Sequence, residues 1–188
     1  MKKGWTVTQL TAIGALAALG LVISLPGAVV AALTGTSFIG AGVNVIAIGI
    51  LYPLVALLFK KVGSVTLWTF IGGILALPFP IAGPPGFFLK IPYFVFWGVL
   101  TDLTYLIFRK SEKVAAIAIS AFGIGPALIL APLFWKILGA PQLEKQYSSF
   151  SPWYFVLAAS IAGGLLGYLS YLIYKKVEKT AIVERIQK

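Results

Sequence analysis

Six long apolar stretches, separated by short polar or proline-rich connections, make up most of the chain. They span residues 5–25, 39–59, 64–79, 88–108, 114–138 and 153–174. A helix needs about 20 apolar residues to cross the hydrocarbon core of a bilayer. These stretches are too long and continuous for the alternating strands of a membrane barrel. The pattern predicts an all-α membrane protein, with residues 1–188 forming a single bundle of six transmembrane helices that ends in a basic tail at 175–188.

Proline and glycine interrupt this pattern at three places. The first stretch is expected to end at Pro26-Gly27, and the third is short and runs into Pro80. The fifth stretch contains four helix breakers, which are Gly123, Gly125, Pro126 and Pro132. Irregular backbone is tolerated at membrane depth where it lines a cavity or packs within protein. The breaks therefore favour a cavity beside the fifth stretch and the connection at 78–86.

Basic residues fall mainly on one side of the predicted bundle. Twelve of the 15 lie at the N-terminus, in the second and fourth connections and in the tail: Lys2, Lys3, Lys60, Lys61, Arg109, Lys110, Lys113, Lys175, Lys176, Lys179, Arg185 and Lys188. The other side has Lys90, Lys136 and Lys145. Because basic residues mark cytoplasmic loops, both the N and C termini are expected to be cytoplasmic. Lys2-Lys3 before an apolar run also fits a signal peptide, but the length of the run favours a retained helix.

Composition narrows the chemistry that the chain can perform. It is 60% hydrophobic, with a mean hydropathy of +0.98, which is more apolar surface than a soluble domain of this length can bury. The net charge of +10 comes from clusters between apolar runs, so nucleic-acid binding is not expected. The absence of Cys and His removes thiolate metal sites and the commonest general base.

An enzyme is therefore not expected, and neither is a cofactor. The apolar stretches contain one carboxylate, Asp102, where a two-aspartate site would need two. No Gly-x-x-x-x-Gly-Lys-Ser/Thr loop is present, so any ATP would be bound by a partner. Two interpretations of Asp102 stay open: an anchor near the inner interface, or a group that couples transport to a proton or ion.

Polar and aromatic side chains gather in the predicted outer half of the membrane. The candidates for substrate binding are Asn44, Lys90, Tyr93, Trp97, Trp135, Lys136 and Tyr154. A cavity with aromatic walls and a few polar groups is the usual form of a small-molecule site. The alternative is an interfacial belt with lysines that reach the headgroups.

Small residues recur in the first and sixth stretches. In the first, they form the pairs Thr11/Ala15 and Gly14/Ala18, each spaced by four. The sixth contains Ala159, Ser160, Gly163, Gly164 and Gly167. Small residues let helix backbones approach closely in a membrane. They indicate either packing inside the bundle or a docking face for another membrane subunit.

The chain resembles the substrate-binding S component of energy-coupling factor (ECF) transporters, which are prokaryotic vitamin importers of the cell membrane. The resemblance rests on size, six predicted spans, cytoplasmic termini and the small-residue first span, and covers nearly the whole chain. Residues 83–86, Gly-Pro-Pro-Gly, and the segment 97–102 look like the third loop and fourth helix of such proteins.

This resemblance implies specific partners. Thr11/Ala15 and Gly14/Ala18 would dock a transmembrane coupling subunit that is driven by two ATPase subunits. A vitamin or other small micronutrient would bind from outside the cell, beneath loops at 26–38, 80–87 and 139–152.

The sequence does not identify the substrate. Lys90 and Lys136 lean toward an anionic molecule, and the aromatic residues toward a ring. The alternative function is a non-transporting scaffold or assembly subunit of a membrane complex, in which the outer polar residues would not converge on one pocket. A channel has less support, because no ring of charges or filter sequence is visible.

Overall fold

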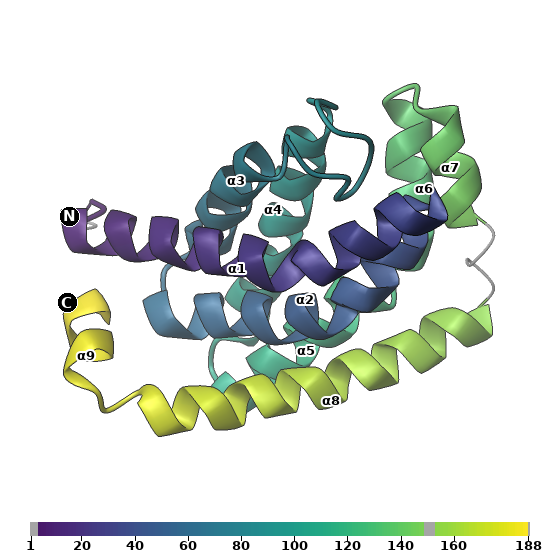
Figure 1. The fold of residues 1–188 in the computed structure, drawn as a ribbon. Coiled ribbons are helices and arrows are strands. Elements are labelled where there is room, and N and C mark those ends of the chain that lie inside the picture. The colour runs from purple at the N-terminus through teal and green to yellow at the C-terminus, as the bar shows by residue number, and fades with distance from the viewer. Residues whose placement is uncertain (1–3, 149–152, 188) are drawn as a thin grey trace.

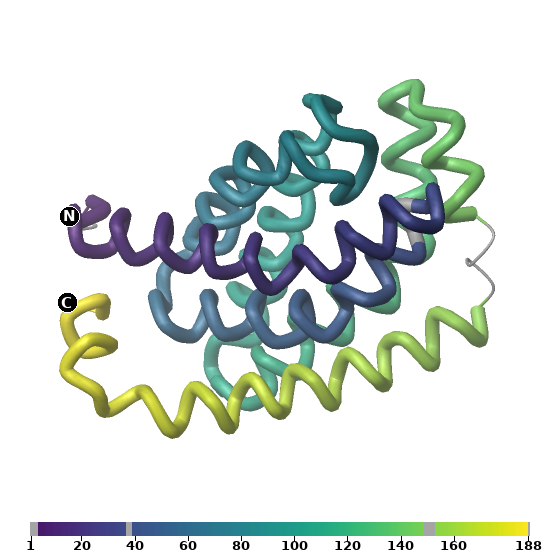
Figure 2. Tube along the Cα trace, in the orientation of Figure 1, coloured from purple at the N-terminus to yellow at the C-terminus, as the bar shows by residue number. Residues whose placement is uncertain are grey.

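The computed structural model describes residues 4–148 and 153–187. Lys2, Lys3, Lys188 and the last residues of the expected fifth loop, 149–152, lie outside the described residues. The described part of the chain is all helical (Figures 1 and 2). The helices are α1 (Val7–Thr34), α2 (Ser37–Phe59), α3 (Ser64–Leu75), α4 (Lys90–Phe108), α5 (Glu112–Ile124), α6 (Ala127–Ile137), α7 (Pro141–Ser148), α8 (Trp153–Val177) and α9 (Ala181–Gln187).

Length and composition show which of these helices can cross a membrane. Among the described residues, α1, α2, α4 and α8 are long and apolar enough. α5 and α6 are bent by 51° at a short break and make a fifth span if they act as one. α3 has 12 residues, about 18 Å of helix against a hydrocarbon core of roughly 30 Å. The helices fit a multi-pass membrane protein with four or five such spans, where the sequence pattern predicts six.

The first helix continues through Pro26 instead of ending there. Proline removes one backbone hydrogen bond, but apolar residues continue beyond it as far as Leu33. Gly27 and Ala31 are buried where Gly40 of α2 approaches so closely that an added Cβ would fall on them. This contact holds the second half of α1 in place. The expected first loop, 26–38, is therefore mostly helix.

Another proline, Pro53, lies inside α2 and leaves the Gly49 carbonyl without its helical N–H partner. The Ser120 hydroxyl of α5 donates to that carbonyl. The Ser170 hydroxyl of α8 donates to the neighbouring carbonyl of Ile50 at 2.8 Å. Because hydrocarbon offers no hydrogen-bond partners, these serines satisfy the interrupted helix and fix α2 between α5 and α8.

Glycines bring α8 against α5. At Gly163 and Gly167, an added Cβ would fall against the α5 backbone at Ser120 and Ala116. Close approach of this kind is what small residues permit between membrane helices. The small residues of the sixth stretch thus serve packing inside the bundle.

Two of the four predicted breakers divide the fifth stretch where α5 ends and α6 begins, whereas Gly123 lies within α5 and Pro132 within α6. Gly125 and Pro126 separate the two helices, and Gly125 lies against Ser160 of α8. Beyond α6, residues 141–148 of the expected loop at 139–152 form α7.

Asp102 caps a neighbouring helix. It is buried in α4, and its carboxylate accepts hydrogen bonds from the first turn of α3: from the Thr66 N–H at 2.9 Å, the Thr66 hydroxyl at 2.6 Å and the Val65 N–H at 3.4 Å. A carboxylate at a helix N-terminus accepts hydrogen bonds from free N–H groups and interacts favourably with the positive end of the helix dipole. Neither interpretation of Asp102 from the sequence, as an interfacial anchor or as a coupling group, included this contact between helices.

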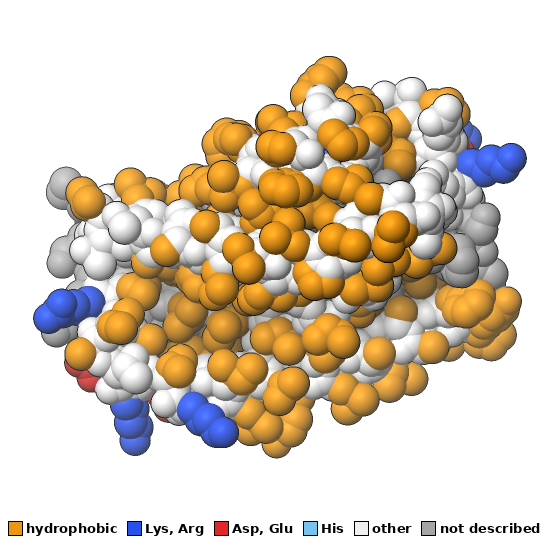
Figure 3. All heavy atoms as spheres, viewed as in Figure 1, with side chains coloured by type: hydrophobic (Ala, Val, Ile, Leu, Met, Phe, Trp, Pro, Cys, Tyr) orange, Lys and Arg blue, Asp and Glu red, His pale blue; other side chains and the backbone are white. Residues whose placement is uncertain are grey.

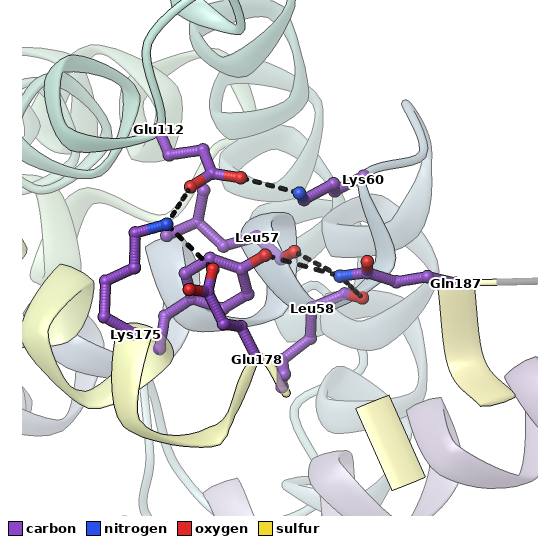
Figure 4. Close-up of polar contacts among 8 residues, drawn as sticks. Leu57, Leu58, Lys60, Glu112, Lys175, Glu178 and Gln187 are labelled. Carbon is purple, nitrogen blue, oxygen red and sulfur yellow. Dashed lines mark hydrogen bonds and ion pairs between the residues drawn. The ribbon is translucent and has the colours of Figure 1, made fainter. Parts of the chain in front are cut away.

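Both ends of the described chain lie at the same end of the bundle (Figure 1). There, Glu112 pairs with Lys60 at 2.6 Å and with Lys175 at 3.0 Å (Figure 4). The hydrogen bond from Lys60 to Glu112 raises the pKa of the lysine above its ordinary value. These ion pairs tie the ends of α2, α5 and α8 together.

The short helix α9, in the predicted tail, packs on this cluster. Gln187 donates to the Leu57 and Leu58 carbonyls at the end of α2 (Figure 4). Gln9, which forms a capping box with Thr6 at the start of α1, donates to the Ile186 carbonyl at 2.8 Å. On the face shown in Figure 3, hydrophobic side chains cover the middle of the molecule and basic side chains lie toward its ends.

Candidate functional site

A cavity of about 270 Å³ lies among α1, α2, α3 and α4, with further walls from α5, α6, α7 and α8. The turn after α3 also lines it, through Pro80, Ile81 and Ala82. Small residues line much of the cavity and leave space between the helices. Those of α1, α2 and α3 are Ala17, Gly20, Ser24, Gly27, Gly40, Ala41, Gly42, Ala47 and Gly72. Helices that would otherwise touch therefore enclose a space large enough for a small molecule.

Aromatic side chains form the rest of the wall. The lining includes Tyr52, Trp68, Tyr93, Phe94, Trp97 and Tyr147. Trp68 meets Tyr52 edge to face, with ring centroids 5.2 Å apart. Tyr93 contacts Trp97 at 6.0 Å in the same way. Such rings provide broad apolar faces together with hydroxyl and indole N–H groups at their edges.

Asn44 contributes an amide to this wall. Its side chain is 6% exposed and, within the described part of the chain, has no hydrogen-bond partner. It lies directly on Gly27 of α1, where an added Cβ would overlap it. An amide that lines a cavity without a partner in the protein can both donate and accept a hydrogen bond there. This group is therefore suited to a hydrogen bond with a bound molecule.

The structure brings three of the predicted residues together and leaves four aside. Asn44, Tyr93 and Trp97 line the cavity. Trp135 stacks on Tyr93, with centroids 4.5 Å apart, and supports the wall from behind. Lys136 is exposed, and Tyr154 is 54% exposed on α8.

Lys90 is fully buried but does not line the cavity. Its ammonium group donates to the Phe79 carbonyl and to the Ala76 carbonyl, at 3.3 Å from the latter. These two backbone carbonyls belong to the turn after α3, so the lysine stabilises the connection between α3 and α4. Neither predicted lysine therefore lies where it could contact a molecule in the cavity.

The sequence interpretation missed the contributions of α1, α3 and α7. Its candidate residues all came from the second, fourth, fifth and sixth stretches. The available signal was spacing: Trp68, Gly72 and Ala76 recur every four residues, which places them on one helix face. Tyr147 had no comparable signal. Its side chain is hydrogen-bonded to Tyr93, and burial holds the pKa of Tyr147 well above its ordinary value.

The predicted docking residues lie apart from the cavity, on the outside of α1. Thr11, Ala15 and Ala18 are exposed and Gly14 is half-buried. An added Cβ at Gly14 would meet nothing within 4 Å. This part of α1 is thus free to receive another helix.

The chain matches no family model, and neither a curated protein nor a solved structure matches it significantly. Within the residues that the structure describes, no three His, Cys, Asp or Glu side chains group closely enough to hold a metal ion. What the arrangement offers is a site for non-covalent binding of a small molecule.

Proposed function

We propose that this protein is the substrate-binding S component of an ECF-type importer. It captures a vitamin or other small micronutrient outside a prokaryotic cell for uptake that partner subunits drive with ATP. The observation that carries the proposal is the aromatic cavity with the unpartnered amide of Asn44 in its wall. A cavity of this size, with aromatic walls and a few polar groups, is the usual form of a small-molecule site.

The proposed orientation has six membrane passages and cytoplasmic termini. The shared position of both chain ends and the basic residues near them support it (Figure 1). α3 and the turns after it form the shortest passage and end beside the cavity. The turn at 80–82 and α7 then cover the cavity on the outer side, in place of simple loops.

The proposed partner is a transmembrane coupling subunit, which docks on α1 and carries two ATPase subunits. The exposed small residues Thr11, Ala15 and Ala18 support this surface, because they let a partner backbone approach as larger side chains would not.

Two leucine substitutions test binding and docking separately. Gly72 lines the cavity and Gly14 lies on the proposed docking surface; an added Cβ meets no atom within 4 Å at either glycine. Purified protein is denatured, and the small molecules it releases are identified by mass spectrometry. Gly72→Leu should release none and still assemble with the coupling subunit. Gly14→Leu should release the same molecule as the wild type and fail to assemble.

The matched pair also separates the proposal from the scaffold alternative. The scaffold alternative predicts three results together. The protein would yield no bound molecule, would take up none of a panel of vitamins when co-expressed with an ECF module, and would still assemble through α1. Equal ligand occupancy in wild type and Gly72→Leu would place the binding site outside the cavity.

A further inference from the structure

The cavity wall has no charge among the residues that the structure describes. Its polar groups are an amide, hydroxyls and indole N–H groups. Two buried charged side chains of the bundle make their contacts elsewhere: Lys90 donates to backbone carbonyls, and Asp102 caps α3. Both are also absent from the lining. The cavity therefore differs from the anion-binding site that Lys90 and Lys136 would have formed.

An uncharged wall discriminates against ions. A charged molecule that enters must leave its hydration shell, and it meets no opposite charge in return. Aromatic faces attract cations, but cation binding would still leave the Asn44 amide without a partner matched to both its donor and its acceptor. A neutral molecule loses far less hydration and can satisfy the amide on both sides.

The shape and size of the cavity restrict the ligand further. The faces of Trp68 and Trp97 favour a flat ring, because offset or edge contacts between rings exceed what burial alone contributes. The volume of about 270 Å³ is just below the roughly 300–1,000 Å³ of typical small-molecule pockets. One ring or a fused pair with short substituents fills that space.

Resting on the proposed function, we infer that the substrate is an uncharged aromatic or heteroaromatic ring compound. Its ring lies against Trp68 and Trp97, and its polar edge meets the Asn44 amide. The protein thus selects its substrate by ring and hydrogen-bonding pattern, and the absence of a counter-charge excludes charged relatives of the same molecule.

Sets of ring compounds that differ in charge test this inference. One set is nicotinamide, nicotinate and 1-methylnicotinamide; another is pyridoxine, 4-pyridoxate and pyridoxamine. Binding is measured by tryptophan fluorescence, since Trp68 and Trp97 report on the cavity, and the molecule released from purified protein is identified by mass spectrometry. In any set that binds, the neutral member should bind about tenfold more tightly or better. The released molecule should be a neutral ring at pH 7.

The outcomes separate this inference from the proposed function. A charged released molecule, or a charged set member that binds as tightly as the neutral one, overturns the uncharged class and leaves the importer proposal standing. Loss of the released molecule in Gly72→Leu shows that the cavity is its site. No released molecule, no binding in either set and no vitamin uptake would remove the proposed function and this inference together.

Discussion

Replacing Asn44 by leucine should weaken ligand binding without harming the fold. The side chains have similar size, and the amide has no hydrogen-bond partner within the described residues. In the ligand-free protein, the substitution removes an unpaired polar group, so the free energy of unfolding should stay level or rise by about 1 kcal/mol. In the complex, one amide–ligand hydrogen bond is lost, which costs about 1–3 kcal/mol. The Kd should therefore rise roughly tenfold to a hundredfold.

The assay pairs two measurements on the same detergent-purified protein. Thermal unfolding without ligand gives Tm, and titration with the molecule released from the wild type gives Kd. Gly27→Ala provides an independent perturbation, because its Cβ would overlap the Asn44 side chain and displace the amide. Gly14→Ala is the matched control on the same helix, where the Cβ meets open space.

The expected pattern is a raised Kd in Asn44→Leu and Gly27→Ala, and an unchanged Kd in Gly14→Ala. An unchanged Kd in Asn44→Leu would show that the amide does not contact the ligand. A large fall in Tm in that variant would show that Asn44 holds the fold together and is not held ready for a ligand.

Three further predictions concern the scaffold around the site. Asp102→Ala should lower the free energy of unfolding by about 1–2 kcal/mol through loss of the α3 cap, and an altered Kd at equal occupancy of the folded state would contradict its purely structural role. Ser120→Ala should lower the free energy of unfolding by about 1 kcal/mol, because the Gly49 carbonyl loses its hydrogen bond; thermal unfolding measures this loss against Thr104→Val, which removes a hydroxyl that donates within its own helix, α4. A cysteine at Val62, in this cysteine-free chain, should react with an impermeant maleimide only after cell lysis; labelling of intact cells would reverse the orientation.

The helices follow from the apolar pattern, but their ends depend on contacts that the pattern does not contain. The apolar residues after Pro26 allow α1 to continue, but the contact that holds this half of the helix in place is the approach of Gly40 from α2. The tail reads as a basic extension, yet α9 forms there because Gln9 and the end of α2 receive it. The break at Gly125-Pro126 was predictable, since both residues interrupt helices by their own backbone chemistry.

The candidate site was predictable in part for the same reason. Asn44 stands out as a polar residue in hydrocarbon, and Trp97 as an aromatic in the same layer. The contacts of Lys90 could not be predicted from the sequence. A lysine in this position can reach headgroups, a ligand or backbone carbonyls, and it contacts carbonyls here because the turn after α3 presents them. Tyr147 lines the cavity because α7 packs beside it, and no hydrophobic periodicity in the sequence predicted α7.

The interrupted backbone of α2 has a consequence for biogenesis. When α2 enters the bilayer during synthesis, the Gly49 carbonyl lacks the N–H that Pro53 cannot supply, and the serine that completes it is 71 residues further along the chain. Ser170, which serves the adjacent carbonyl, follows later still, in α8. Until Ser120 is in place, the helix has an unsatisfied acceptor in a solvent without donors. A nascent chain that ends before α5 therefore leaves this carbonyl of α2 without its hydrogen-bond donor.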